Sequence, residues 1–85
     1  MSTLIRVHAK QVLAQLVEKA LHTGELTVFF SYSETMNKIA IEENHLKICL
    51  LYLYDNNYLK RIRNDGDDLR LVEITAKGID FVEEK

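Results

Sequence analysis

The 85-residue chain has few of the features that mark specialised classes of protein. Cys49 is the only cysteine, so an intrachain disulfide is excluded, and a reducing compartment fits this composition. The glycines, Gly24, Gly66 and Gly78, lie far apart, which excludes a glycine-rich phosphate-binding loop. The longest mainly apolar run, residues 48–54, is far too short to cross a bilayer.

The N-terminal segment, MSTLIRVHAK, also lacks the features of a signal peptide. It carries charge at Arg6 and Lys10 and has no long apolar run. We therefore expect a soluble, cytoplasmic protein without contact to a membrane.

The composition is that of one small globular domain. Apolar residues make up 47% and charged residues 28% of the chain, which separates it from disordered tails. We interpret residues 1–85 as a single domain. The net charge of -2 gives no overall attraction to phosphate, so a nucleic-acid-binding protein of this composition needs its basic residues gathered locally. Dimerisation would let so short a chain bury more apolar area.

Residues 3–22 predict a long helix, because apolar residues recur at spacings of three and four and no glycine or proline interrupts them. Gly24 then suits a left-handed helix end. The apolar stripe is broad, which leaves two interpretations: a central core helix, or a core helix whose N-terminal half also pairs with a second copy. The predicted stripe consists of Leu4, Val12, Leu13, Leu16, Val17, Ala20 and Leu21.

The next segment predicts a strand and a short helix. Residues 25–30, ELTVFF, are β-branched and aromatic, which is typical of a short strand or an extended connection into the core. Ser31 and Glu34 have the spacing of a capping box, which predicts a second helix over residues 32–39. The side chains expected to face the core are Met36 and either Ile39 or Ala40.

A third helix and a hairpin follow. The helix is predicted over residues 41–55 and ends at Asn56 and Asn57, since asparagine tolerates the left-handed conformation. Asp65 and Gly66 are a strong tight-turn signal between strands. Those strands are predicted over residues 58–64 and 69–74, before a last short helix that Thr75 caps. The buried stripe of the third helix is expected to be Leu46, Cys49, Leu50 and Leu53.

This order of elements resembles the winged helix-turn-helix superfamily over nearly the whole chain. The resemblance is carried by residues 41–62, by the turn at Asp65 and Gly66, and by residues 74–82, ITAKGIDFV. The last stretch is similar to the Leu-Thr-x-x-Gly-x-x-Phe-Leu segment of MarR- and PadR-like regulators, and the chain also resembles small YjcQ-like prophage-type proteins. The implied fold is a small α+β winged-helix domain, with a three-helix core, a β-hairpin wing and a short C-terminal helix.

The resemblance implies that the third helix enters the major groove and that the hairpin contacts the DNA backbone or the minor groove. The residues implied to face base edges are Asn44, His45 and Lys47. Those implied to hold the backbone are Lys60, Arg61, Arg63 and Arg70. Strand alternation places Arg61 and Arg63 on one face and Lys60 on the other. The alternative for this basic hairpin is a charged edge that discourages aggregation.

The predicted third helix matches a groove helix poorly. Ile48 and Leu51, with Tyr52 beside them, lie opposite its buried stripe at about 100° per residue. This apolar pair is covered by residues 25–30, forms a homodimer seam, or docks a different protein. Several carboxylates would also repel phosphate here and at the hairpin turn: Glu42, Glu43, Asp55, Asp65, Asp67 and Asp68.

Two hypotheses follow. The first is a small transcriptional regulator that binds double-stranded DNA as a homodimer, an argument by analogy with the fold. The second is a winged-helix module that binds another protein through Ile48, Leu51 and Tyr52, such as an adapter or inhibitor encoded on a mobile element. The acidic total charge and the outward apolar pair favour this alternative.

Neither a catalytic site nor a metal or cofactor site is predicted. His45 and Cys49 share one helix face, but two ligands do not make a zinc site. Ser31, Ser33 and Thr35 have no obvious partner base. We therefore predict a protein that is not an enzyme and uses no metal and no cofactor.

Overall fold

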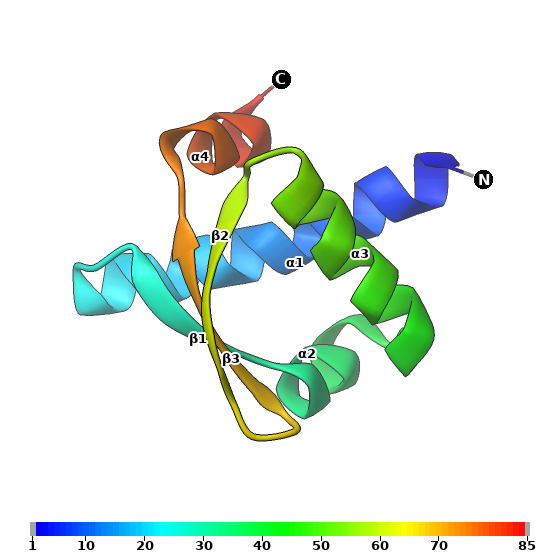
Figure 1. The fold of residues 1–85 in the computed structure, drawn as a ribbon. Coiled ribbons are helices and arrows are strands. Elements are labelled where there is room, and N and C mark those ends of the chain that lie inside the picture. The colour runs from blue at the N-terminus through cyan, green and yellow to red at the C-terminus, as the bar shows by residue number, and fades with distance from the viewer. Residues whose placement is uncertain (1, 85) are drawn as a thin grey trace.

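The computed structural model describes residues 2–84, in which helices and an antiparallel sheet form an α+β fold (Figure 1). The elements and their order are those predicted from the sequence; the outermost residues of the predicted domain, 1 and 85, lie outside the described part. The elements are α1 (Ser2–Thr23), β1 (Thr27–Ser31), α2 (Tyr32–Ile39), α3 (Glu43–Asp55), β2 (Leu59–Asp65), β3 (Leu69–Ile74) and α4 (Ala76–Glu83). None of the helices between residues 2 and 84 has the length and apolar content needed to cross a membrane.

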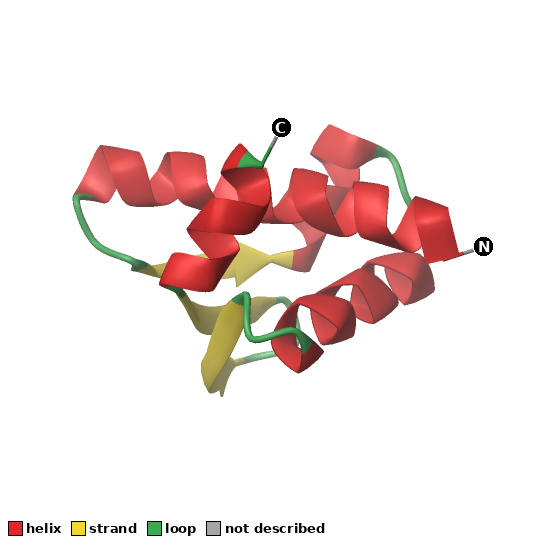
Figure 2. Cartoon of the chain, turned by 90° about the horizontal axis from the view of Figure 1, so that it is seen from above, coloured by secondary structure: helices red, strands yellow, loops and turns green. Residues whose placement is uncertain are grey.

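The strands form one antiparallel sheet in the order β1-β3-β2, so the segment predicted as a strand or connection is a true edge strand. The helices lie against one face of the sheet and leave the other face open (Figure 2). Side chains alternate accordingly. On β1, Val28 and Phe30 face the helices and are buried, whereas Phe29 points to the open face and is 44% exposed.

The core lies between α1, α3 and the inner face of the sheet. The four residues predicted as the buried stripe of α3 are each 3% exposed or less. Burying a side chain of the size of leucine stabilises a protein by roughly 1.5–3 kcal/mol, so this stripe fixes α3 firmly. The other large contributors are Val12, Leu13, Leu16, Phe30, Leu59, Val72, Ile74 and Phe81.

The stripe predicted for α1 was too broad. Leu4 is 52% and Leu21 is 79% exposed, although the sequence pattern placed both in the core. A helix turns by about 100° per residue, so both lie on the side of α1 away from the buried Ala9 and Leu16. The core elements cover only part of the apolar surface of this helix.

α2 begins as predicted, but its buried side differs from the expectation. The Ser31 side chain accepts a hydrogen bond from the Glu34 backbone nitrogen at 3.2 Å, which caps the helix. The Glu34 carboxylate binds Lys19 at 2.9 Å, so the capping box is only half formed. Tyr32 and Thr35 are the buried residues of α2, Met36 and Ile39 are half-buried, and Ala40 is an exposed left-handed helix end.

α3 begins at Glu43 rather than at residue 41, because Glu42 has an extended backbone and precedes the helix. Its end is as predicted: Asn56 is the C-cap and Asn57 has a φ of 62°. The asparagine pair therefore turns the chain from α3 into the hairpin.

α4 closes the fold against the connection between α3 and β2. Thr75 caps it as predicted: its hydroxyl accepts from the Gly78 nitrogen at 3.0 Å and donates to the Asn57 carbonyl oxygen at 2.6 Å. A Cβ at Gly78 would overlap the Tyr58 carbonyl oxygen. The glycine of the closing segment thus allows a close backbone approach, and Phe81 stacks on the Tyr58 ring with centroids 4.3 Å apart.

Candidate nucleic-acid interface

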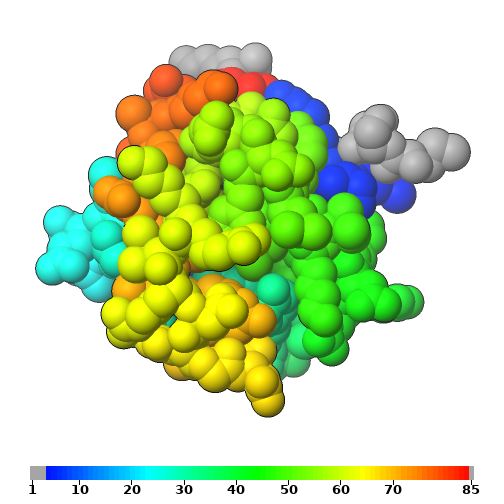
Figure 3. All heavy atoms as spheres, in the orientation of Figure 1, coloured from blue at the N-terminus to red at the C-terminus, as the bar shows by residue number. Residues whose placement is uncertain are grey.

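A cleft of about 300 Å³ separates α3 from the β2–β3 hairpin. The hairpin (yellow) and α3 (green) lie side by side on the face of the molecule that Figure 3 shows. The cleft brings together Lys47, predicted to face bases, with Arg61 and Arg70, predicted to hold the backbone. Its lining consists of Tyr32, Lys47, Leu50, Leu51, Tyr54, Arg61, Asn64 and Arg70.

The first cation of the cleft is Arg61. Its guanidinium lies over the Tyr54 ring, 4.7 Å from the centroid, which is a cation–π contact. Among the described residues no carboxylate lies within ion-pair distance of it. Its charge therefore remains available to an anion in the cleft.

Arg70 is held by the hairpin itself. Its guanidinium lies 5.0 Å from the centroid of the Tyr32 ring. The same group donates to the carbonyl oxygens of Gly66 and Leu69, both at 2.9 Å. Arg70 thus stabilises the turn and joins it to α2, while its charge still adds to the positive field of the cleft.

The Tyr54 hydroxyl is buried at the cleft and has no hydrogen-bond partner among the described residues. Burial raises the pKa of Tyr54, and the Arg61 guanidinium opposes that shift because it lies close enough to interact with the hydroxyl and carries a positive charge. The hydroxyl is therefore protonated at neutral pH. A buried donor without a partner costs about 1–3 kcal/mol, so an acceptor that entered the cleft would gain from binding it.

A β-bulge in β2 separates the two arginines that strand alternation placed together. Arg61 lies opposite Val72 and Arg63 lies opposite Leu71, with Ile62 inserted between them. Because Val72 and Leu71 are neighbours in β3, their side chains point to opposite faces. The predicted shared face of Arg61 and Arg63 is therefore wrong: only Arg61 faces the cleft.

Lys60 and Arg63 lie on the open face of the sheet instead. Arg63 forms a bidentate pair with Asp65 at 2.8 Å and 3.2 Å, which lowers the pKa of Asp65. Lys60 is exposed, lies opposite Glu73 in β3, and makes no ion pair among residues 2–84. The hairpin therefore divides its positive charge between two faces.

The residues of α3 predicted to face bases point in different directions. Asn44 is exposed. Lys47 lines the cleft and pairs with Glu43 one turn earlier, at 3.4 Å. His45 turns away to α1, where its Nε2 lies 2.8 Å from Nδ1 of His8 in a hydrogen bond. α3 therefore offers Asn44 and Lys47 to a ligand, and His45 serves the contact between two helices.

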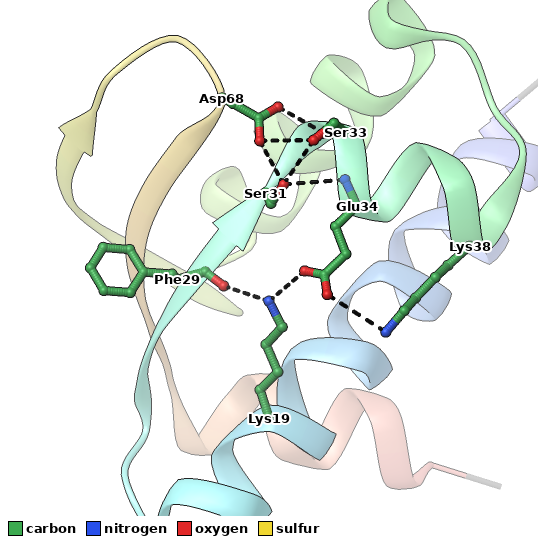
Figure 4. A network of polar contacts seen from close by, with 7 residues as sticks. All are labelled: Lys19, Phe29, Ser31, Ser33, Glu34, Lys38 and Asp68. Carbon is green, nitrogen blue, oxygen red and sulfur yellow. Dashed lines mark hydrogen bonds and ion pairs between the residues drawn. The ribbon is translucent and has the colours of Figure 1, made fainter.

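A polar network that the sequence did not predict fixes the hairpin against α2 (Figure 4). The Asp68 carboxylate accepts hydrogen bonds from the Ser31 hydroxyl at 2.6 Å, the Ser33 nitrogen at 2.9 Å and the Ser33 hydroxyl at 3.0 Å. The bond from Ser31, and then that from the Ser33 backbone, lower the pKa of Asp68. Asp68 was expected only as a turn residue; here it sets the position of one cleft wall.

Ile48 and Leu51 are 49% and 46% exposed, which excludes the alternative that residues 25–30 cover them and leaves the other two open. Leu51 is at the cleft. Tyr52, predicted beside them, is half-buried and packs near Tyr58 with ring centroids 6.5 Å apart. The outward apolar pair therefore remains a surface for a second molecule.

Cys49, the other side chain considered for a zinc site, lies in the core. The Cys49 thiol is buried and lies 3.8 Å from the Ile5 carbonyl oxygen, and burial raises its pKa. Between residues 2 and 84, no group of three or more histidine, cysteine or acidic side chains is arranged to hold a metal ion.

Comparisons of the chain with protein-family models, with curated proteins and with solved structures found no match.

Proposed function

We propose that this chain is a winged-helix DNA-binding protein in which α2 and α3 form the helix-turn-helix and the β2–β3 hairpin is the wing. The observation that carries the proposal is the cleft between α3 and the hairpin, whose wall brings Lys47, Arg61 and Arg70 together with Tyr54. A phosphate oxygen is an acceptor for all four groups. The element order supports the fold assignment by analogy.

The cations differ in how readily they meet a phosphate. Arg61 has no carboxylate partner among the described residues, whereas Lys47 must break its ion pair with Glu43 to bind a phosphate. That exchange is inexpensive, because exposed ion pairs contribute only about 0–1 kcal/mol. Arg70 keeps its bonds to the turn and acts through its charge. We therefore assign the direct phosphate contact to Arg61 and the supporting contact to Lys47.

We expect α3 to recognise base edges only weakly. Asn44 is the remaining exposed amide near the start of α3, since His45 is bonded to His8. Glu43 and Asp55 lie exposed at the two ends of the same helix and repel phosphate. We expect binding that depends mainly on the DNA backbone, as in sequence-independent binding with dissociation constants of about 1–100 µM.

A fluorescence-anisotropy titration tests the proposal. A labelled random duplex is titrated at low salt, with the expectation of binding in that micromolar range and a salt dependence of about two to three released counterions. Arg61→Ala should weaken binding, whereas Lys77→Ala, which removes the same charge from exposed Lys77 on α4, should not. Absence of binding up to about 100 µM protein would sink the proposal.

One observation favours a second candidate function, a module that binds another protein. Ile48 and Leu51 are about half exposed on the outer side of α3, and apolar side chains gathered on a small domain mark contact surfaces. Ile48→Ser removes the part of this surface that lies outside the cleft and leaves the core untouched. Loss of a protein partner with unchanged affinity for the random duplex would favour this candidate over the first.

A further inference from the structure

α1 has two apolar faces, and the described residues cover only one of them. On the inner face, Ala9 and Leu16 are at most 3% exposed. On the outer face, Leu4 is 52%, Val7 is 44% and Leu21 is 79% exposed. Helices of soluble domains usually present a polar face to water, so three large apolar side chains on this one need an explanation.

The outer face follows the spacing of a helix-pairing seam. From Leu4 onward its residues recur at alternating steps of three and four, the a-and-d pattern of a coiled coil. They stay on one side of α1 along nearly all of its length, which is roughly 33 Å for a helix of this size. The seam consists of Leu4, Val7, Gln11, Ala14, Glu18 and Leu21.

Each position of the seam lies opposite another seam position when a second copy lies antiparallel. A two-fold axis through the middle of α1 pairs Leu4 with Leu21 of the second copy. It also pairs Val7 with Glu18, and Gln11 with Ala14, because the axis places residues at equal distances on either side of the middle of α1 opposite each other. All seam positions thus find a partner, and the two most exposed leucines meet at both ends.

Charge favours the antiparallel arrangement over a parallel one. Arg6 and Lys10 already pair with Glu84 of the same chain, whereas Glu18 lies within the C-terminal half of the seam. Glu18 makes no ion pair within residues 2–84. A parallel second copy places the two Glu18 carboxylates opposite each other, whereas an antiparallel copy keeps them apart.

Hollows along the seam provide room for the side chains of a second copy. One of about 260 Å³ lies at the C-terminal end of α1 and is mainly apolar, with Val17, Leu21 and Ile79 in its wall. The antiparallel pairing places Leu4 of the second copy at its edge. A second hollow, of about 400 Å³, lies beside Val7 and Ala14.

We propose that two copies of this chain associate through the outer faces of α1, antiparallel about a two-fold axis near the middle of the helix. Polar Gln11 and Glu18 within the seam set the register at a cost in stability. The dimer is therefore weak and forms at micromolar to submillimolar concentrations. The inference is independent of DNA binding, and its experiments contain no nucleic acid.

Disulfide trapping tests both the contact and its direction. Leu4→Cys and Leu21→Cys are made as separate proteins with different tags; native Cys49 is fully buried and does not compete. Under mild oxidation, the mixture should give a covalent dimer of one protein of each kind, and each protein alone should give little. Covalent dimers formed equally well by Leu4→Cys alone, or none in the mixture, would overturn the antiparallel seam.

Sedimentation velocity gives an independent test. The wild-type chain should shift from monomer to dimer between about 5 µM and about 500 µM, the range of a small interface. Val7→Glu with Leu21→Glu should keep it monomeric. Ile48→Glu with Leu51→Glu, a control with the same charge change on α3, should leave the dimer intact.

Circular dichroism establishes that both double variants are folded. The proposal is overturned if the wild-type chain stays monomeric throughout. It is equally overturned if only the α3 variant loses the dimer, because the interface then lies on α3.

Discussion

The two walls of the cleft are held in place by different forces. The α3 wall is anchored by four almost fully buried side chains on the inner side of the helix. The hairpin wall is anchored at its tip by polar contacts: Asp68 binds Ser31 and Ser33, and Arg70 binds carbonyl oxygens of the turn. The position of α3 therefore depends on apolar burial, whereas the tip of the hairpin is fixed by polar contacts beyond the buried part of its strands.

The walls also differ in what they offer a ligand. The α3 wall presents Leu51 and a lysine that already has a carboxylate partner. The hairpin wall presents Arg61, which lies over the face of Tyr54 and makes no ion pair among the described residues. A phosphate would thus meet most of its attraction on the hairpin, while α3 supplies the opposite side of the cleft.

The largest expected effect concerns the anchoring of α3. Leu53→Ala empties a fully buried site and should reduce the free energy of unfolding by about 2–5 kcal/mol. Leu51→Ala removes the same atoms from a side chain that is 46% exposed and should cost less than about 1 kcal/mol. Urea denaturation measures both. Equal losses for the two variants would show that α3 is not anchored through its inner face.

The next effect concerns the division of charge on the hairpin. Arg61→Ala should weaken binding to a random duplex about tenfold at low salt, which is about 1.4 kcal/mol. Arg63→Ala changes the net charge equally, but its side chain lies on the open face and pairs with Asp65. It should weaken binding only about twofold, through longer-range attraction.

Anisotropy titrations of the two arginine variants, side by side, measure this ratio. Equal weakening by both would mean that the bulge does not direct binding to the cleft.

The sequence predicted the features that depend on neighbouring residues. The spacing of Leu46, Cys49, Leu50 and Leu53 predicted which face of α3 is buried, because helix periodicity is local. Ser31, Thr75 and the turn at Asp65 were predicted correctly for the same reason: caps and turns are determined by a few consecutive residues.

The features that depend on distant segments were not predictable in this way. The bulge at Ile62 follows from how β2 pairs with β3, so alternation within β2 alone gave the wrong face for Arg63. Asp68 meets Ser31 across 37 positions, and His45 meets His8 across the same separation. The exposure of Leu4 and Leu21 depends on how many elements cover α1, which its own pattern does not reveal.

The smallest expected effect is a pH dependence of stability, which distinguishes the polar contacts of the hairpin wall from the apolar burial of the α3 wall. The pKa of Asp68 in the folded chain lies below its ordinary value of 3.8, first because Ser31 donates to the carboxylate. A lowered folded pKa means that ionised Asp68 contributes stability above pH 3.8, and that this contribution is lost as pH falls through the folded pKa. The stability difference between the wild-type chain and Asp68→Asn should therefore stay constant between pH 7 and about pH 5 and shrink below pH 3.8.

Thermal unfolding of both proteins across this pH range measures the difference. The other carboxylates are the same in both proteins, so their titration does not contribute to it. Leu53→Ala is the matched control, because burial of an apolar side chain does not titrate and its difference from wild type should not vary with pH. If the Asp68→Asn difference stayed unchanged down to about pH 2.5, well below the ordinary pKa, the carboxylate would not be what fixes the hairpin to α2. The contrast between an apolar wall and a polar wall would then fail at the hairpin.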